Sequence, residues 1–364
     1  MTLRILGACS PGEVRIAVLG DDELMDYAIW RTGKPDGVGD LYRGRVTRRV
    51  PALAGSFVAL DGMDGFLPDN EGGIGLREGD FISVRVTRAA RGGKGPRLTA
   101  HLRADEIPPA RGPGALLELA RHYPGAAVLV DDTALAARLQ AELGGRLGVV
   151  DRAFDDTISG RVEALALDDI ELSNRVRLHI HPTPALVAID IDAGRAVASR
   201  EGKSALHLRA NQAALPGLAR QIRLRNLSGA ILVDFAGLSA RRRAALAPAL
   251  RAALADDPLR PRLLGFTALG LAEIVRRSVH PPLHELLAGA HAAGLAALRQ
   301  IAIEAAAHPY AVPALRALPA VVAALRDDAA ALSDLARRTG RSLILRSDPN
   351  LGTAWTIETS DASV

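Results

Sequence analysis

The runs PALVAIDID (184–192) and GAILVDF (229–235) decide how this chain folds. Each is a nearly continuous apolar run, and residues 205–224 between them show helical periodicity that we expect Pro216 to interrupt. Two such strands joined by a helix predict a parallel βαβ unit, because parallel neighbours need a long crossover connection. Since the strands are apolar along almost their whole length, we expect their sheet to be buried on both faces.

Both strands end in carboxylates. Asp190 and Asp192 close the first strand and share one of its faces, because side chains in a strand alternate with a period of two, and Asp234 closes the second strand. Ligands of open α/β sheets bind outside the carboxyl ends of the strands, and hard oxygen ligands suit Mg²⁺. The same pattern is compatible with aspartates that cap the following helices or turns.

An all-β region lies upstream of these strands. Residues 14–30 predict a hairpin that turns at Asp21 and Asp22. Residues 39–103 carry short β-branched runs separated by Gly-, Pro- and Asp-rich turns, at the spacing of a small barrel. The clearest of these runs are 45–50, 55–60 and 80–88.

Strand and helix patterns alternate in the rest of the chain. The Pro- and Gly-rich segment 107–113 marks a boundary. The elements expected beyond it are strands at 126–130 and 148–152, helices at 133–143, 241–255, 269–277 and 286–307, and a small α+β appendage over 320–358. These patterns predict an α+β multi-domain protein.

The composition is that of a globular protein with more than one core. The chain has 364 residues, of which 48% are apolar and 24% charged. A single cysteine, Cys9, excludes an internal disulfide and a zinc site with two thiolates, so we expect a cytoplasmic protein. Every apolar run of membrane-spanning length is broken by Arg, Asp or Pro, so no membrane contact is expected.

Aromatic and basic residues occur together in the predicted barrel. Phe57, Phe66 and Phe81 fall among nine basic residues, which are Arg43, Arg45, Arg48, Arg49, Arg85, Arg88, Arg91, Lys94 and Arg97. Rings that stack on bases, beside guanidinium groups that follow the backbone, are what binding of a single nucleic-acid strand requires. The same rings could instead fill the barrel core.

A second basic group precedes the strand that ends at Asp234. Arg220, Arg223 and Arg225 lie on or just after the predicted helix, where they could hold a phosphodiester near the carboxylates. A solvated helix face is the alternative. The net charge of +4 does not decide between the two.

Several motifs in combination resemble the ribonuclease E/G family. Its S1 RNA-binding domain is resembled by DLYRGRVTR (40–48), SFVALDGMDGFLP (56–68) and KGPRLT (94–99). Its catalytic half is resembled, in the same order, by ALVAIDIDAGR (185–195), ARQIRLRNLSGAILVDF (219–235) and GFTALGLAEIVRR (265–277).

The resemblance implies a domain organisation. It is an S1/OB-type barrel (39–103) inserted in an RNase-H-like scaffold (1–38 and 113–170) with a linker at 104–112, then a DNase-I-like α/β catalytic domain (171–300) and a small C-terminal α+β domain (301–364).

The resemblance also implies an activity. Members of the family are Mg²⁺-dependent endoribonucleases that cut single-stranded, often AU-rich RNA. It implies catalytic, metal-binding roles for Asp190 and Asp234 with Asp192 beside them, and RNA contacts at Phe57, Phe66 and Lys94. The other RNA-binding residues that we expect are Arg43, Arg45, Arg220 and Arg223.

The chain departs from the family at three positions near these motifs. Asp192 stands where the family has Asn, Pro184 where it has a Glu, and Ala213 within a run where it has Asn-Leu-Glu-Ala. The alternative to an endoribonuclease is therefore an RNA-binding protein of the same family with a weakened or inactive nuclease site.

Two family features are missing. The segment 104–112 is too short for the domain that senses a 5′-monophosphate, so we expect cleavage that does not depend on the 5′ end. No cysteine pair follows Pro281 and Pro282, so no zinc is expected and a homodimer would form without a zinc link.

Overall fold

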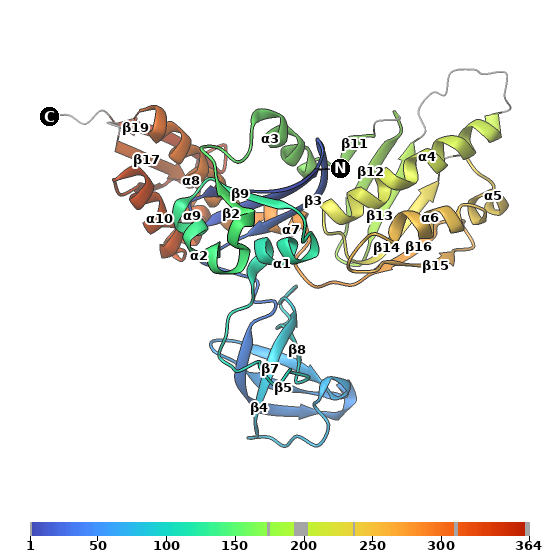
Figure 1. Cartoon of the computed structure of the whole chain (residues 1–364), viewed down its shortest axis with the longest axis horizontal. Coiled ribbons are helices and arrows are strands. Elements are labelled where there is room, and N and C mark those ends of the chain that lie inside the picture. Colours follow the sequence, from blue (N-terminus) through green and yellow to red (C-terminus); the bar gives the residue numbers. More distant parts are fainter. Residues whose placement is uncertain (1, 173–174, 193–202, 236, 309–311, 361–364) are drawn as a thin grey trace.

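The computed structural model describes residues 2–172, 175–192, 203–235, 237–308 and 312–360. These residues form three open sheets and one closed barrel, each with its own hydrophobic core. In Figure 1 a central sheet lies between the second sheet on one side and the C-terminal part on the other, and the barrel projects below it. The chain is thus an α+β protein of several parts, as its alternating patterns predict.

The central sheet has the strand order β10-β9-β1-β2-β3. Its elements are β1 (Leu3–Ser10), β2 (Glu13–Gly20), β3 (Glu23–Trp30), β9 (Ala127–Val130), β10 (Leu147–Val149), α1 (Gly114–His122), α2 (Thr133–Leu143) and α3 (Asp156–Glu163). The predicted hairpin is confirmed, because β2 and β3 pair antiparallel around a turn with Asp21 at a φ of 51°. Both faces of this sheet are covered: Ile5 packs toward α1 and α2, and Leu6 toward α3.

The barrel closes in the order β4-β5-β6-β8-β7 and is inserted between β3 and α1. Its strands are β4 (Leu41–Val50), β5 (Gly55–Ala59), β6 (Asp64–Pro68), β7 (Phe81–Arg88) and β8 (Arg97–Thr99). The core is filled by small aliphatic side chains, namely Val46, Val58, Leu67, Val84, Val86 and Leu98. A small closed barrel of five strands confirms the predicted OB-like architecture in outline.

The second sheet has the order β11-β12-β13-β14-β16-β15. Its elements are β11 (Asp169–Glu171), β12 (Arg177–Pro182), β13 (Val187–Asp192), β14 (Gly229–Phe235), β15 (Arg262–Phe266), β16 (Ala272–Arg276), α4 (Lys203–Leu224), α5 (Ala240–Ala244) and α6 (Ala247–Leu254). β13 and β14 pair parallel and are joined through α4, so the predicted βαβ unit is confirmed.

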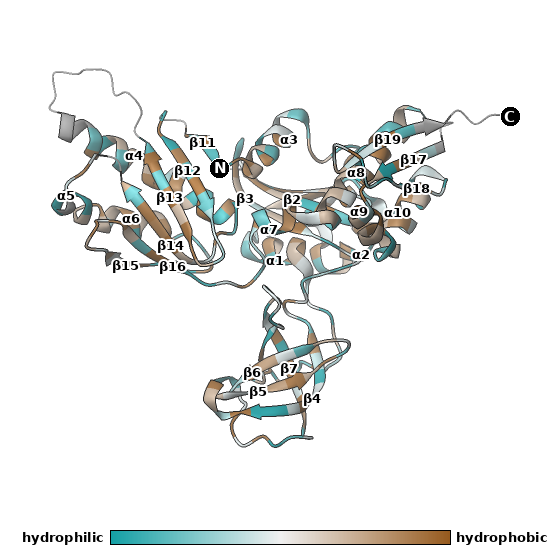
Figure 2. Ribbon diagram, turned by 180° about the vertical axis from the view of Figure 1, so that it is seen from behind, coloured by the Kyte–Doolittle hydropathy of each residue, from teal (hydrophilic) through white to brown (hydrophobic). Residues whose placement is uncertain are grey.

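The prediction that this sheet is buried on both faces is wrong. Ile189 and Ile191 are buried in one core with α4 and α6, whereas Ala188, Asp190 and Asp192 on the opposite face are half-buried or exposed. Burial alternates with the period of two that strand geometry imposes, so the sheet has one covered and one uncovered face. Figure 2 shows the helices on one side of these strands.

Two helix predictions in this region need correction. α4 runs through Pro216 without interruption, because its buried stripe of Ala214, Leu215, Leu218 and Ile222 packs on the sheet. Burying several such side chains, at about 1.5–3 kcal/mol each, offsets a proline penalty of about 3 kcal/mol. The predicted helix at 269–277 is wrong, because Ala272–Arg276 within it form the strand β16, in which buried Ala272, Ile274 and Arg276 alternate with Glu273 and Val275 on the opposite face.

The C-terminal part packs helices on a small sheet of order β18-β17-β19. Its elements are α7 (Leu283–Leu287), α8 (Gly289–Ala307), β17 (Val312–Ala317), α9 (Pro319–Arg326), α10 (Ala329–Thr339), β18 (Ile344–Ser347) and β19 (Trp355–Ser360). Glu13 of β2 accepts from Arg31 and from Arg299 of α8, which fixes α8 to the central sheet. Among the described residues, no helix has the length and apolar character needed to cross a membrane.

Candidate active site

Asp190 and Asp234 lie side by side on the uncovered face of the second sheet. They are register partners in the parallel pair β13–β14, so their Cα atoms are about 5 Å apart. The side chain of Asp190 is exposed and that of Asp234 is half-buried. The prediction that the two strand ends bring carboxylates together is thus supported by the register itself.

Neither aspartate caps a helix. The helix N-caps whose side chains accept a backbone N–H are supplied by Asp132, Asp155 and Asp328, all in other parts of the fold. Asp190 and Asp234 instead lie inside strands. Helix capping is therefore excluded for these two residues.

Asp234 combines a buried oxygen with a nearby cation. Its Oδ1 atom is buried and accepts no hydrogen bond from the described residues. The Nη1 atom of Arg243, on α5, lies 2.9 Å from this oxygen as an ion pair. Arg243 is itself held by the Leu238 carbonyl, which accepts from its Nε at 2.9 Å. Sequence reasoning missed this arginine, because its place depends on how α5 folds back against β14.

A histidine extends the carboxylate pair into a row across four strands. Asp169 of β11 pairs with His179 of β12, His179 pairs with Asp190, and Asp190 pairs with Asp234. The His179 Nδ1 atom lies 3.8 Å from Asp169 Oδ1. The sequence signal for this row is the alternation of Arg177, His179 and His181, which marks the open face of a strand.

The residues present fit a cation held by two carboxylates. Within the described ranges, no group of three or more His, Cys, Asp or Glu side chains is placed to hold a metal ion, so Asp192 joins no such set. Mg²⁺ commonly uses one or two protein carboxylates and completes its shell with waters and substrate phosphate. The buried, unbonded Oδ1 of Asp234 beside Asp190 matches that requirement.

The departures at 184 and 213 lie away from the carboxylate pair. Pro184 is exposed in the turn before β13. It precedes Asp190 by six residues, which span about 20 Å when the chain is extended. Ala213 is exposed on α4. Asp192 is on the same face as Asp190 and pairs in register with Arg177.

Phe57 and Phe66 lie on the outer surface of the barrel. They are register partners on β5 and β6, with ring centroids 5.5 Å apart in an edge-to-face arrangement. The Arg48 guanidinium lies 5.0 Å from the centroid of Phe57. Gly55 leaves room for the second ring, because a Cβ there would lie 2.5 Å from Phe66 Cζ. Both rings are half-buried and outside the aliphatic core, so the core alternative is wrong for them.

The predicted basic residues fall into two groups. Arg43 and Arg45 are exposed on β4. Lys94 is exposed in a turn, where its backbone forms an antiparallel bridge with that of Arg91. Arg220 instead forms an ion pair with Glu23 at 2.7 Å, and the Nε of Arg223 donates to the Met25 carbonyl at 3.0 Å. These two contacts hold α4 against β3, so RNA binding by Arg220 and Arg223 stays a prediction.

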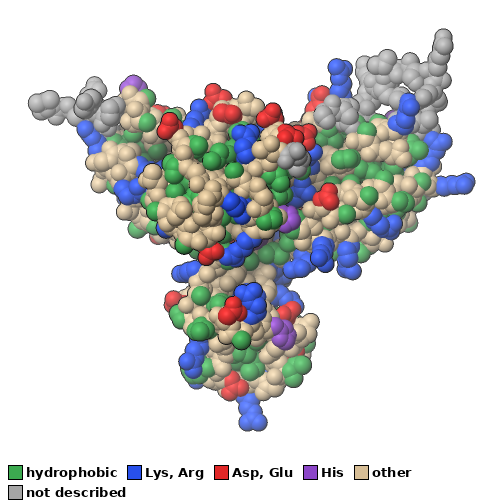
Figure 3. Space-filling model, in the orientation of Figure 1, with side chains coloured by type: hydrophobic (Ala, Val, Ile, Leu, Met, Phe, Trp, Pro, Cys, Tyr) green, Lys and Arg blue, Asp and Glu red, His purple; other side chains and the backbone are tan. Residues whose placement is uncertain are grey.

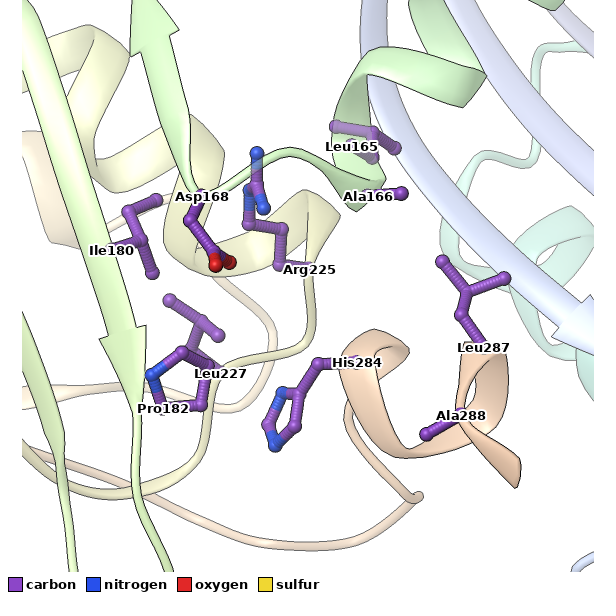
Figure 4. A pocket seen from close by; sticks show the side chains of 10 residues that line it. All are labelled: Leu165, Ala166, Asp168, Ile180, Pro182, Arg225, Leu227, His284, Leu287 and Ala288. Carbon is purple, nitrogen blue, oxygen red and sulfur yellow. The ribbon is translucent and has the colours of Figure 1, made fainter. Parts of the chain in front are cut away.

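The pocket in Figure 4 lies at the other end of β14 from Asp234. It has a volume of about 270 Å³ and includes Asp168, Arg225, Leu227 and His284 in its lining. Burial lowers the pKa of Arg225 to about 10 and also lowers the pKa of His284. Neither group reaches the carboxylate pair, so the candidate active site is the open sheet face rather than this pocket.

Comparison with known proteins agrees with this geometry. The model of the ribonuclease E/G family matches residues 150–279, which include Asp190, Asp192 and Asp234. This chain belongs to the ribonuclease E/G family. It is 22% identical to ribonuclease G of Escherichia coli K12 over 79% of this chain and 82% of that protein.

Two further relatives carry the name ribonuclease E. The chain is 23% identical to that of Escherichia coli K12 over 78% of this chain and 38% of the relative. It is 34% identical to that of Nostoc sp. PCC 7120 over 32% of this chain and 17% of the relative. Membership of this family implies that the chain is an endoribonuclease of RNA processing or decay.

Proposed function

We propose that this chain is a Mg²⁺-dependent endoribonuclease that cuts single-stranded RNA, with Asp190 and Asp234 holding the ion. The observation that carries the proposal is the register pairing of the two carboxylates on an uncovered sheet face, with one buried Asp234 oxygen left without a hydrogen bond among the described residues. Asp192 lies beside the pair and takes an outer place in the site.

The residues of the site have separate roles in this proposal. Mg²⁺ bound there supplies polarisation of the phosphoryl oxygen and a water activated for attack. Asp190 and Asp234 would hold the ion, and Arg243 orients the Asp234 carboxylate through its ion pair. The uncovered face leaves space for the phosphodiester, since neither α4 nor α6 covers it.

The barrel is the RNA-holding part in the same proposal. The rings of Phe57 and Phe66 offer stacking surfaces to bases, and Arg43, Arg45 and Lys94 offer exposed cations to the backbone. The proposed division is a barrel at 39–103 within a scaffold of 1–38 and 113–170, a catalytic domain at 171–300 and a C-terminal domain at 301–364. Its support is the insertion of the barrel strands between β3 and α1.

One observation favours a second candidate, an RNA-binding protein with a weakened nuclease site. Arg243 already places a cation 2.9 Å from Asp234 Oδ1, and a positive charge there competes with a metal ion. Among the described residues no third ligand is placed to compensate. Cleavage and binding must therefore be measured separately.

The test uses a labelled, unstructured RNA incubated with the full chain, with Mg²⁺ or with EDTA. We expect cleavage only with Mg²⁺, and we expect Asp190→Asn and Asp234→Asn each to slow it about 100-fold, the equivalent of about 3 kcal/mol in the barrier. Both variants should fold: Asp190→Asn should melt as the parent does, because that side chain is exposed, and Asp234→Asn should melt slightly lower, because it loses the ion pair with Arg243. Binding without Mg²⁺-dependent cleavage would establish the second candidate, and cleavage at the parent rate in either variant would refute the site.

A further inference from the structure

Phe81 is an aromatic ring that the barrel core does not use. It is the first residue of β7, and it is 66% exposed, whereas Phe57 and Phe66 are half-buried. The core is complete without it, since it contains only aliphatic side chains. Single exposed apolar side chains are common on protein surfaces, so the arginines beside this ring, rather than its exposure alone, point to a ligand.

Guanidinium groups surround this ring. Arg43 lies 5.7 Å from the ring centroid, and Arg45 is the register partner of Phe81 across the β4–β7 pair. Within the described chain, Arg43, Arg45 and Arg48 form no ion pair with an acidic side chain. Asp80 and Glu78 keep their negative charge and accept backbone N–H groups, of Arg77 and Arg49 respectively. The two side chains placed beside the ring, Arg43 by its contact and Arg45 by its register, are both cationic.

The surface around Phe81 is continuous with that around Phe57. β4 lies between β5 and β7 in the barrel, and the partners of the two rings on β4 are three residues apart. Two strand spacings and this offset along β4 together separate the rings by roughly 12–14 Å. Arg45 and Arg48 of β4 lie between them, as the partners of Phe81 and Phe57 respectively. Figure 3 shows Lys and Arg side chains projecting from the barrel.

We propose that Phe81, with Arg43 and Arg45, forms a second base-stacking subsite for single-stranded RNA, separate from the Phe57 and Phe66 pair. An RNA strand that crosses β4 would stack one base on Phe57 and another on Phe81, and would place the phosphates between them over Arg45 and Arg48. This inference rests on the proposed function, because it assumes that the barrel holds RNA. The unpaired positive charge selects a nucleic acid over a protein partner, and a single exposed ring is far smaller than the apolar core of a stable protein interface.

The test compares Phe81→Ala with Ile74→Ala, which removes another exposed apolar side chain of the barrel region, 77% exposed and with no aromatic ring to stack on a base. Affinity for a labelled single-stranded RNA is measured in EDTA at fixed salt, so that no RNA is cut. We expect Phe81→Ala to weaken binding about 5- to 150-fold, the range of one lost stacking contact. Ile74→Ala should bind as the parent does, Phe81→Trp should restore binding, and the melting temperature should not change in any variant.

Further variants separate this inference from the proposed function. Arg43→Ala should reduce the dependence of binding on salt by about one ion, since it removes one phosphate contact. Parent affinity in Phe81→Ala, while Phe57→Ala binds weakly, would overturn the subsite and leave the proposed function intact. An equal loss in Ile74→Ala, or a change in oligomeric state with unchanged RNA affinity, would also overturn it. Failure of the parent chain to bind RNA would instead refute the RNA-holding role of the barrel.

Discussion

Replacing His280 should loosen the junction between the barrel, the central sheet and the second sheet. His280 follows β16, and its Nδ1 lies 2.6 Å from Asp36 Oδ2, in the segment that leads into the barrel. Its Nε2 lies 3.1 Å from Glu118 Oε2 on α1, the first helix after the barrel. The His280 imidazolium therefore contacts both the segment that enters the barrel and the helix that follows it. It links them to the end of β16, the strand that pairs with β14.

The magnitude follows from these two contacts. A hydrogen bond to a charged group contributes about 1.5–3 kcal/mol, and the side chain is 33% exposed, so we discount the pair to about 2–3 kcal/mol in total. His280→Ala also leaves two carboxylates facing each other without a cation. At about 2–4 °C per kcal/mol, the melting temperature should fall by about 4–12 °C.

The effect depends on pH with a definite sign. Burial by itself would lower the pKa of His280, but the hydrogen bonds with Asp36 and Glu118 outweigh burial and raise this pKa from 6.5 to about 10. A raised folded-state pKa means that the stabilisation is complete below pH 6.5 and is lost as pH rises toward 10.

The assay is thermal unfolding of the parent, His280→Ala and His280→Gln between pH 6 and 10. The difference between the parent and His280→Gln should be largest at the acidic end and should shrink as pH rises, because glutamine keeps hydrogen-bonding capacity but has no charge to lose. A gap that stayed constant over this range, or that widened with pH, would refute the bridging role of the imidazolium.

Three further predictions concern activity. Asp192→Asn should cut RNA within about threefold of the parent rate, a difference below about 1 kcal/mol in the barrier, because Asp192 joins no ligand set in the described residues; complete loss would make it a required ligand. Phe57→Ala and Phe66→Ala should each weaken single-stranded RNA binding by about 1–3 kcal/mol with little change in melting temperature, whereas a loss of stability of about 3–5 kcal/mol would mark a core ring. RNAs with 5′-hydroxyl and 5′-monophosphate ends should be cut at rates within about threefold of each other, since the chain between β8 and α1 forms no helix or strand that could build a sensor; a tenfold preference for the monophosphate would contradict this.

The strands that carry the candidate site could be predicted from sequence, but their neighbours could not. Apolar runs that end in carboxylates identify β13 and β14 directly, and the helix between them predicts that they are parallel. The pairing of His179 with Asp190 depends on β12 lying antiparallel to β13, and the alternation that marks β12 as a strand does not say which strand it pairs with. Arg243 reaches Asp234 only because α5 folds back over the end of β14. Such contacts depend on tertiary packing that no local pattern encodes.

The same limit explains the basic residues of α4. Helical periodicity places Arg220 and Arg223 near one another but does not say what faces them. Their partners, Glu23 and the Met25 carbonyl, lie on β3, almost 200 residues away in sequence. Alternation along β5 likewise gives Phe57 and Val58 opposite faces without saying which face is inside. Barrel closure decides that question, because a narrow interior accepts valine and leucine and turns the phenylalanine rings outward.

The expectation of a sheet buried on both faces was wrong for a reason that bears on function. Residues such as Ala188 and Ala230 made the strands look apolar throughout, yet alanine loses little when it is left half-exposed on a surface. On the uncovered face these small side chains do not obstruct access to Asp190 and Asp234 from solvent. A polymeric substrate needs such access, because under the proposed function a strand of RNA passes over these carboxylates rather than entering an enclosed cavity. Covering that face with a helix would force both carboxylates out of water, at a cost of several kcal/mol for each uncompensated charge. The open face of β13, which carries Ala188, Asp190 and Asp192, therefore leaves the proposed catalytic site both hydrated and accessible to RNA.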